Sequence, residues 1–405
     1  MNSGRDLLLN SNFLKNRIAE LGIKQWWLAE QVGVDRKTVI RWTQGQVRSI
    51  QAENASALAQ VLSCDIKDLT LSNEADQLAT IDDQKSAAQL LAGSSLIDKL
   101  GPIGEWNVIE GLLRATIVPD LPSGVLAELY NQLTIASWRQ SKIDQAEIYN
   151  RKAEDLAVRS NDKAVLAGAL LSKANLLSWR GKTSKAIATY RECLSLEPYI
   201  SPRTVGSIYS NLGAVLFESG QHAEGELYLR KALDCFALFG KPMNLSIAWC
   251  HLAMLYLETG PLEEAHAACL NSISFAEADS YLRGIAMGKL VSAEIFARRG
   301  KTEEAKKTMN DGLADFVKLG IEEGLNYEFA GRISLLLGQR VEAEAFLRKG
   351  ISISAEFPLS RAALFFELAK LLSSRDFASE AFRLYSECDA NQRSESVKYF
   401  IKSMA

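Results

Sequence analysis

The chain has 405 residues, of which 47% are hydrophobic and 23% are charged. This composition is typical of a folded, soluble protein, and the length allows two or more domains. The 8 prolines and the lack of alternating β-branched segments predict an all-α chain. No apolar run approaches the roughly 18 residues of a membrane span, and the first residues carry no signal-peptide core. We therefore expect a cytoplasmic protein without a membrane partner.

The charge is distributed unevenly along the chain. Residues 1–70 carry nine Lys/Arg and seven Asp/Glu, a net charge of +2, whereas the remaining residues carry a net charge of −5. Only the first segment therefore suits a nucleic-acid partner, provided that its cations share one face. The six cysteines are scattered without a C-x-x-C pair, which is typical of small core residues in a cytoplasmic protein.

The sequence KQWWLAEQVGVDRKTVIRWTQG, residues 24–45, has the pattern of two short helices joined by a tight turn. Gly33 follows the apolar stripe of the first helix and predicts its end, because glycine tolerates positive φ. Asp35 stands at the N-cap position of the second helix, whose inward residues are Val39 and Trp42. A short helix with three cations and a hydroxyl on its outer face suits a DNA major groove, and the alternative is a helical hairpin with a solvated basic face. The outer face carries Arg36, Lys37, Thr38 and Arg41.

Residues 12–69 resemble a Cro/CI-type (XRE-family) helix-turn-helix domain of five helices. Gln25 matches the glutamine with which the second helix of this family begins, and Gly45 matches the glycine that closes the recognition helix. Further matches are Leu28-Ala29, Gly33-Val34 and the ending Ala55–Leu62 with Leu69. The resemblance implies a DNA-binding domain over residues 10–70 and a phosphate contact for Gln25. The residues expected to contact double-stranded DNA are Gln25, Arg36, Lys37, Thr38 and Arg41.

One position departs from the family pattern. The family usually has a glutamate where this chain has Thr43, and that glutamate pairs with an arginine of the first helix. Arg17 stands at the matching place, so we expect it to lack this partner. The departure does not touch the DNA-facing residues.

A fixed period follows the first domain. Residues 71–84 are polar and acidic and predict a linker, and residues 85–120 predict a helical pair interrupted by Gly101–Gly104. From residue 123 to 390, a turn residue is followed five places later by a small residue about every 40 residues. The turn residues are Ser141, Gly181, Gly220, Gly260, Gly300, Gly338 and, in a degenerate seventh unit, Asp376.

A period of this size indicates a solenoid of helix pairs. The small residue suits a close crossing of the two helices of a pair. The units resemble tetratricopeptide (TPR) repeats, best in the third, where Leu212-Gly213, Gly225 and Ala232 fall on family positions. We therefore predict a five-helix head, a right-handed TPR-like α-solenoid of about seven repeats, and a capping helix over residues 391–405.

Signals for catalysis are weak. The histidines at positions 222, 251 and 266 have no metal-ligand spacing, and no nucleophile motif or complete phosphate-binding loop occurs. We expect no enzyme activity, no metal and no cofactor.

A Cro/CI-type reader joined to a TPR solenoid resembles the peptide-sensing RRNPP regulators. The resemblance implies quorum sensing, in which a short signalling peptide binds the concave face and alters a dimer that carries two DNA-binding heads. Three hypotheses stay open: a ligand-responsive transcription regulator, a regulator whose solenoid binds a protein partner, and a helical scaffold whose head no longer reads DNA. The cations of the predicted recognition helix argue against the third. A single head of net charge +2 is expected to bind DNA weakly, so we predict a symmetric homodimer.

The first helix of each TPR pair lines the inner groove, and counting along the repeats places side chains there. Asparagine amides can hold the backbone of an extended peptide, aromatic side chains and methionine give apolar pockets, and Arg332 or Lys370 would take a terminal carboxylate. The alternative is that these side chains pack between helices. The residues expected to line the groove are Asn131, Trp138, Asn175, Trp179, Asn211, Phe217, Met254, Glu294, Glu328, Arg332 and Lys370.

Overall fold

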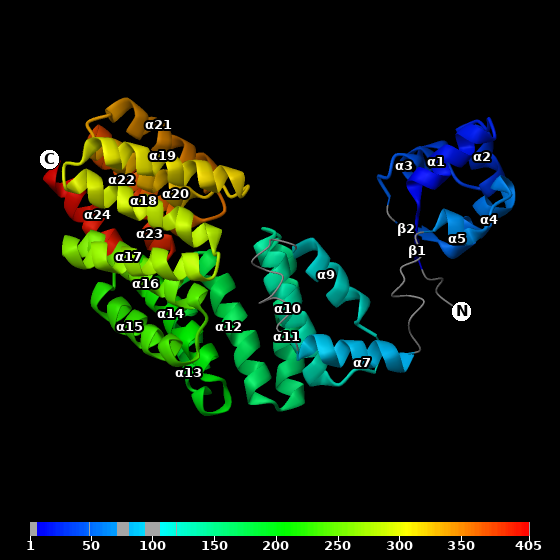
Figure 1. Cartoon of the computed structure of the whole chain (residues 1–405), viewed down its shortest axis with the longest axis horizontal. Helices are drawn as coiled ribbons and strands as arrows, with labels where there is room; N and C mark the ends of the chain where they lie inside the picture. The colour runs from blue at the N-terminus through cyan, green and yellow to red at the C-terminus, as the bar shows by residue number, and fades with distance from the viewer. Residues whose placement is uncertain (1–5, 48, 71–80, 94–105, 119, 405) are drawn as a thin grey trace. The chain divides into compact units, whose positions relative to one another are not determined.

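The computed structural model describes residues 6–47, 49–70, 81–93, 106–118 and 120–404, which form two compact units divided after Ala87. The predicted all-α class is confirmed, apart from one small sheet in the first unit (Figure 1). Most of the predicted linker, residues 71–80, and the predicted break at residues 101–104 lie outside the described residues. Helix α7 (Ile81–Ala92) begins inside the range that was expected to be linker.

The first unit contains five helices and a two-stranded antiparallel sheet. The strands β1 (Asp6–Leu8) and β2 (Ser49–Gln51) pair with Leu7 opposite Ile50, so the segment before the first helix is fixed to the segment after the recognition helix. Sequence periodicity did not indicate this sheet, because each strand has only three residues. The helices are α1 (Ser11–Glu20), α2 (Gln25–Val32), α3 (Arg36–Thr43), α4 (Ala52–Leu62) and α5 (Ile66–Leu69).

Local signals set the ends of the two central helices as predicted. Gly33 ends α2 in the left-handed conformation with φ of 75°. Asp35 caps α3, because its carboxylate accepts hydrogen bonds from the Thr38 backbone N–H at 2.8 Å and from the Thr38 hydroxyl at 3.1 Å. Val39 and Trp42 are buried, and they turn the opposite face of α3 toward solvent.

Arg17 has partners other than the missing glutamate. Its guanidinium donates to the backbone carbonyls of Leu62 at 3.2 Å and Ser63 at 3.3 Å, and to the Glu20 carboxylate at 3.2 Å. The two carbonyls lie at the C-terminus of α4, where a cation is favourable. Arg17 therefore lacks the glutamate of the family pattern, as expected, and the end of α4 takes the place of that side chain.

The second unit is built from antiparallel helix pairs stacked in sequence order (Figure 1). It opens with the end of α7 and with α9 (Trp106–Ala115), and a short 3-10 turn over Glu197–Tyr199 follows the second pair. Helix α24 (Asn391–Ser403) follows the last pair. The pairs are α10 (Ser123–Arg139) with α11 (Ile143–Ser160), α12 (Lys163–Trp179) with α13 (Thr183–Leu194), α14 (Pro202–Glu218) with α15 (His222–Phe239), α16 (Pro242–Thr259) with α17 (Leu262–Ala278), α18 (Leu282–Arg298) with α19 (Thr302–Lys318), α20 (Gly324–Leu336) with α21 (Arg340–Ile353), and α22 (Pro358–Leu372) with α23 (Arg375–Glu387).

A left-handed residue lies between the two helices of each pair. The turn residue predicted for the seventh pair, Asp376, was wrong, because Asp376 lies in the first turn of α23. The turn residue of this pair is Ser373, with φ of 49°. Serine carries no glycine signal, so the sequence placed this turn three residues too late. The other six predicted positions, Ser141, Gly181, Gly220, Gly260, Gly300 and Gly338, all have positive φ.

The small residues lie where the helices of a pair cross. In the third pair a Cβ atom on Gly225 would stand 3.0 Å from the Gly213 carbonyl oxygen and 3.0 Å from the Phe217 backbone nitrogen. A Cβ atom on Gly213 would stand 2.8 Å from the Leu229 side chain. Backbone therefore approaches backbone at this crossing, and only glycine allows it. No helix in the described part of the chain has the length and hydropathy needed to cross a membrane.

Candidate DNA-binding face and inner groove

The outer face of α3 presents three cations. Arg36, Lys37 and Arg41 are exposed, whereas Thr38 is half-buried and its hydroxyl donates to Asp35. Two hydrogen bonds from Thr38 lower the pKa of Asp35, the backbone bond being the larger cause, so Asp35 remains an anionic cap. The three cations share the face that burial of Val39 leaves free, and this arrangement suits phosphates or base edges.

Gln25 and Thr43 connect α2 and α3, the two helices of the helix-turn-helix motif. The Gln25 amide nitrogen donates to the Thr43 hydroxyl oxygen at 3.2 Å, and that hydroxyl donates to the Ile40 carbonyl at 3.0 Å. This bond orients Gln25, and among the described residues its amide oxygen has no hydrogen-bond partner. The threonine that departs from the family pattern therefore links α3 to the start of α2. The phosphate contact expected of Gln25 stays a prediction.

Asparagines of successive first helices form a hydrogen-bonded ladder in the second unit. Asn131 of α10 accepts from the Ser172 hydroxyl of α12 at 2.6 Å. Asn175 of α12 accepts from Asn211 of α14 at 2.9 Å and from the Tyr190 hydroxyl at 2.6 Å. All three predicted asparagines are only half-buried. The amide oxygens of Asn131 and Asn175 accept these bonds, whereas Asn211 donates one of its own N–H groups. The amide nitrogens of Asn131 and Asn175 therefore remain available for a ligand carbonyl.

Trp138 and Trp179 pack together. Their ring centroids are 4.9 Å apart at 79°, and Trp179 also meets Phe357 at 5.0 Å and 81°. Both contacts are edge-to-face and stabilise the packing of aromatic rings. The two tryptophans remain half-buried, so they have a packing role and still offer apolar surface.

The predicted charged groove residues are bound to one another. Glu294 is only 1% exposed and lies 2.6 Å from an Arg298 nitrogen and 2.8 Å from an Arg332 nitrogen. Arg332 also donates to Glu328 at 2.5 Å. Burial opposes ionisation of Glu294, but the charges of Arg332 and Arg298 outweigh it and lower the pKa of Glu294. Arg332 is thus held between two carboxylates, an arrangement that differs from the free carboxylate receptor expected from the sequence.

Three further groove predictions have different surroundings. Lys370 lies 2.5 Å from the Glu367 carboxylate. Met254 is 9% exposed and belongs to the hydrophobic core, which assigns it to packing between helices rather than to the groove surface. Phe217 is half-buried and meets the His222 ring at 6.0 Å between centroids.

The last helix returns to the third repeat and closes the solenoid on itself. Arg393 of α24 donates to the backbone carbonyls of Phe217 and Glu218, both at 3.0 Å. Its guanidinium also makes two hydrogen bonds to the Glu258 carboxylate, one of them at 2.9 Å. Burial opposes ionisation of Glu258, but the His222 and Arg393 hydrogen bonds outweigh it and lower the pKa of Glu258 to about 2.

A second closing contact joins the second repeat to the loop before α22. Phe357 meets Trp179, and Glu356 lies 3.9 Å from the Arg180 guanidinium. A Cβ atom on Gly181 would stand 2.6 Å from Pro358, so this turn lies directly against the seventh pair. These contacts join residues more than a hundred positions apart, and no local pattern in the sequence indicates them.

Sequence reasoning also missed a group of polar side chains beside Trp138. Arg139, the last residue of α10, stacks on Trp138, and its pKa is affected by the charges of Arg283 and Glu323. The one feature of the sequence that could have indicated a role for Arg139 is its position next to Trp138, a predicted groove residue. Arg283 and Glu323 belong to the fifth and sixth pairs, and their proximity to α10 depends on the closed path of the solenoid.

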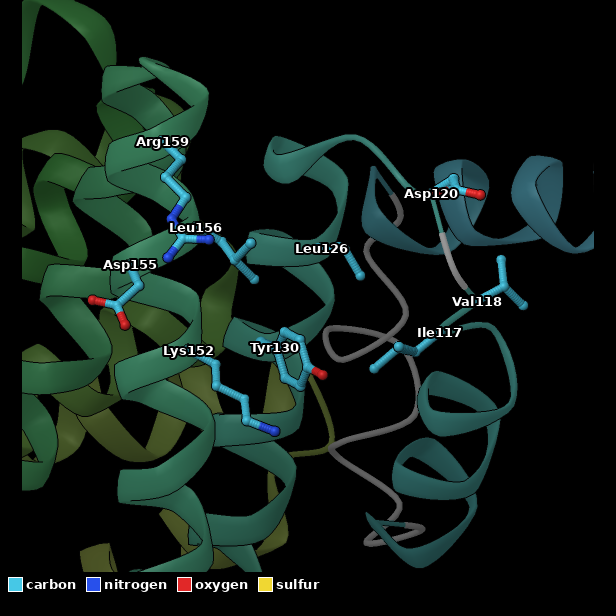
Figure 2. A pocket seen from close by; sticks show the side chains of 9 residues that line it. All are labelled: Ile117, Val118, Asp120, Leu126, Tyr130, Lys152, Asp155, Leu156 and Arg159. Atoms are coloured by element: carbon cyan, nitrogen blue, oxygen red, sulfur yellow. The ribbon is translucent and has the colours of Figure 1, made fainter. Parts of the chain in front are cut away.

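A surface cavity of about 570 Å³ lies between the segment after α9 and the first helix pair (Figure 2). Apolar side chains face it from both walls, with charged residues of α11 at its rim. None of the groove residues expected from the sequence lines it. The lining residues are Ile117, Val118, Asp120, Leu126, Tyr130, Lys152, Asp155, Leu156 and Arg159.

Family comparisons identify both parts of the chain. Residues 13–70 match the model of the Cro/C1-type HTH DNA-binding domain, and residues 205–236 match the model of the tetratricopeptide repeat. The predicted combination of a Cro/CI-type reader with a TPR-like solenoid is thereby confirmed. A search of curated protein sequences finds no significant match.

Solved structures share the fold at low identity. A Rap protein in complex with competence and sporulation factor is 14% identical, with a TM-score of 0.60 over 98% of this chain and 100% of that chain. NprR in complex with its cognate peptide NprX is 15% identical, with a TM-score of 0.54 over 80% of this chain and 98% of that chain. Bacillus thuringiensis PlcR in complex with the peptide PapR7 and DNA is 15% identical, with a TM-score of 0.42 over 67% and 95%. At these identities the likeness to the Rap protein and to NprR concerns the fold alone.

Proposed function

We propose that the chain is a cytoplasmic transcription regulator whose solenoid binds a short peptide on its inner groove and thereby controls DNA binding by the helix-turn-helix head. The observation that carries the proposal is the asparagine ladder. Asn131, Asn175 and Asn211 follow one another on neighbouring first helices, and the first two use only their amide oxygens in the ladder. A row of amides suits the repeating carbonyls of an extended peptide of any sequence.

The shared fold gives independent support. NprR was solved with its cognate peptide, and its fold extends over 80% of this chain. The RRNPP resemblance of the sequence points to the same class of effector. In this proposal the protein is a peptide-responsive regulator. The proposal includes no enzymatic activity.

Two DNA-binding heads are needed for adequate affinity. One small head of net charge +2 covers few base pairs, whereas two heads on a two-fold axis read half-sites one helical turn, or a multiple, apart. We therefore include a homodimer in the proposal. Light scattering at micromolar concentration, with and without DNA, should give twice the chain mass, and a monomer under both conditions would contradict it.

The experiment for the effector begins with mass spectrometry of molecules released when the purified protein is denatured. The synthetic form of a recovered peptide is then titrated against the protein on an operator selected from random DNA. The double variant Asn131→Ala with Asn211→Ala should lose the response but keep basal DNA binding. Asn310→Ala, on the exposed side of α19, serves as the matched control. A double variant that responds fully would place the effector elsewhere.

A protein partner is the second candidate. Helix α15 exposes large apolar side chains on the outer side of the solenoid, with Leu227, Leu238 and Phe239 at least half exposed. Patches of this kind mark protein interfaces. Recovery of a stoichiometric protein instead of a peptide would favour this candidate.

A further inference from the structure

Arg139 has an unusual environment for a guanidinium group. Its Cζ atom lies 4.7 Å from the Trp138 ring centroid and 5.8 Å from that of Trp106 on α9. Among the described residues, no carboxylate forms an ion pair with it, although the side chain is exposed. A guanidinium held by aromatic faces keeps its in-plane N–H donors free. Arg139 is therefore oriented but not neutralised.

The charge of a second cation, Arg283 of the fifth helix pair, acts on Arg139. Arg283 donates to both carboxylate oxygens of Glu323, at 2.9 and 2.8 Å. Burial lowers the pKa of Arg139, the charge of Arg283 adds to this effect, and Tyr281 and Glu323 act against it. Glu323 is bound to Arg283 and acts on Arg139 only through its charge. Arg139 is exposed, so water screens part of its charge, but no carboxylate among the described residues neutralises it.

Two polar atoms beside these cations are buried without a hydrogen-bond partner. They are Nε1 of Trp138 and Nδ1 of His251. Burial lowers the pKa of His251 to about 4, and the charge of Arg283 adds to this effect, so the imidazole is neutral at pH 7. Buried polar atoms in native proteins nearly always have partners, and an orphan indicates a missing ligand or water. The Trp138 indole can only donate, so its missing partner is an acceptor.

We propose that Arg139, held by the rings of Trp138 and Trp106, binds an oxyanion of the effector. The most direct form is the C-terminal carboxylate of a short peptide, whose last side chain packs against Trp138 and Trp179. This inference rests on the proposed function, because it names the chemistry at one end of the same groove. A planar carboxylate matches the two parallel N–H donors of a guanidinium.

The assignment replaces the role expected of Arg332 and Lys370. Arg332 is bound by Glu294 and Glu328, and Lys370 lies 2.5 Å from Glu367. A carboxylate placed there would compete with carboxylates that are already bound. At Arg139 no such competitor lies within ion-pair distance in the described part of the chain.

The test uses the full-length protein and two pools of random heptapeptides that differ only in a free or amidated C-terminus. Peptides retained with the protein on gel filtration are counted by mass spectrometry. The wild type should retain the free-acid pool about tenfold more than the amidated pool, since a charged bidentate contact is lost in the amide. Arg139→Gln should abolish this preference. Arg375→Gln, an exposed arginine on α23, is the matched control and should behave as the wild type.

A second arm separates the peptide carboxylate from other oxyanions. Acetate and inorganic phosphate are added at constant ionic strength, and the melting temperature is measured for the wild type, Arg139→Lys and Arg139→Gln. An anion-dependent rise in the melting temperature of the wild type that is absent in Arg139→Gln supports an oxyanion site. This holds even if neither peptide pool is retained and the peptide proposal fails. The inference would be overturned if all variants retained both pools equally and no anion raised the melting temperature. The proposal that the groove binds a peptide would then still stand. Arg139→Lys keeps the charge and serves if Arg139→Gln does not fold.

Discussion

The contact between α24 and the third repeat gives a quantitative prediction. Arg393→Met removes the guanidinium but keeps most of the apolar stem. It deletes two hydrogen bonds to the carbonyls of Phe217 and Glu218 and two to the Glu258 carboxylate. Helix α24 would then be held to the third repeat only by the contacts of its neighbouring residues, such as Gln392 against Gly220.

The expected loss is about 2 kcal/mol of unfolding free energy. A fully buried ion pair that loses one partner costs about 3–5 kcal/mol. Arg393 and Glu258 are 20% and 35% exposed, so water compensates part of the loss. His222, whose Nε2 lies 3.3 Å from Glu258, offers that carboxylate one remaining partner.

Urea unfolding and hydrogen exchange measure this prediction. The urea concentration at the midpoint of unfolding should be lower for Arg393→Met than for the wild type. In hydrogen exchange, the variant should accelerate the amides of α24 and of the turn at Gly220 more than those of the fourth and fifth pairs. Arg383→Met is the matched control, because within the described part of the chain Arg383 pairs with Glu380 and Glu387 of its own helix alone, and its loss should cost at most about 0.5 kcal/mol. If Arg393→Met were no more damaging than this control, the closing contact would have no energetic weight.

Three further predictions concern the reader, the pH dependence and the helix crossing. On a selected operator, Arg36→Ala and Arg41→Ala should each weaken binding by about 1–3 kcal/mol in fluorescence anisotropy, and unchanged affinity in both would refute the proposed face. Desolvation raises the pKa of the Glu218 carboxyl from 4.5 to about 7, although the residue is exposed in part, so the folded state binds this proton more tightly and loses stability as pH rises from about 4.5 to about 7. Glu218→Gln should therefore stabilise the protein by about 1 kcal/mol at pH 8, after allowance for solvent access, and by nothing at pH 4. Gly225→Val should lower the urea midpoint by an amount equivalent to about 1–3 kcal/mol, because its Cβ atom meets the Gly213 backbone at 3.0 Å, and a neutral result would contradict the close crossing.

The sequence by itself determined the local features of both units. Helix ends follow from residues whose effects are confined to one turn, such as Gly33 at the end of α2 and Asp35 at the start of α3. The repeat period was visible because each pair needs a left-handed turn and a small crossing residue at the same places. Where a turn is made by an ordinary residue, as at Ser373, the pattern failed.

Tertiary structure alone decided which groove residues are free. The sequence placed Arg332 and Asn175 on the same kind of surface, but Arg332 lies between Glu294 and Glu328. Small rotations between successive helix pairs add up along a solenoid, and their sum determines which distant side chains meet. The contacts of Arg393 with Glu258 and of Trp179 with Phe357 depend on that sum, and for this reason no local pattern encodes them.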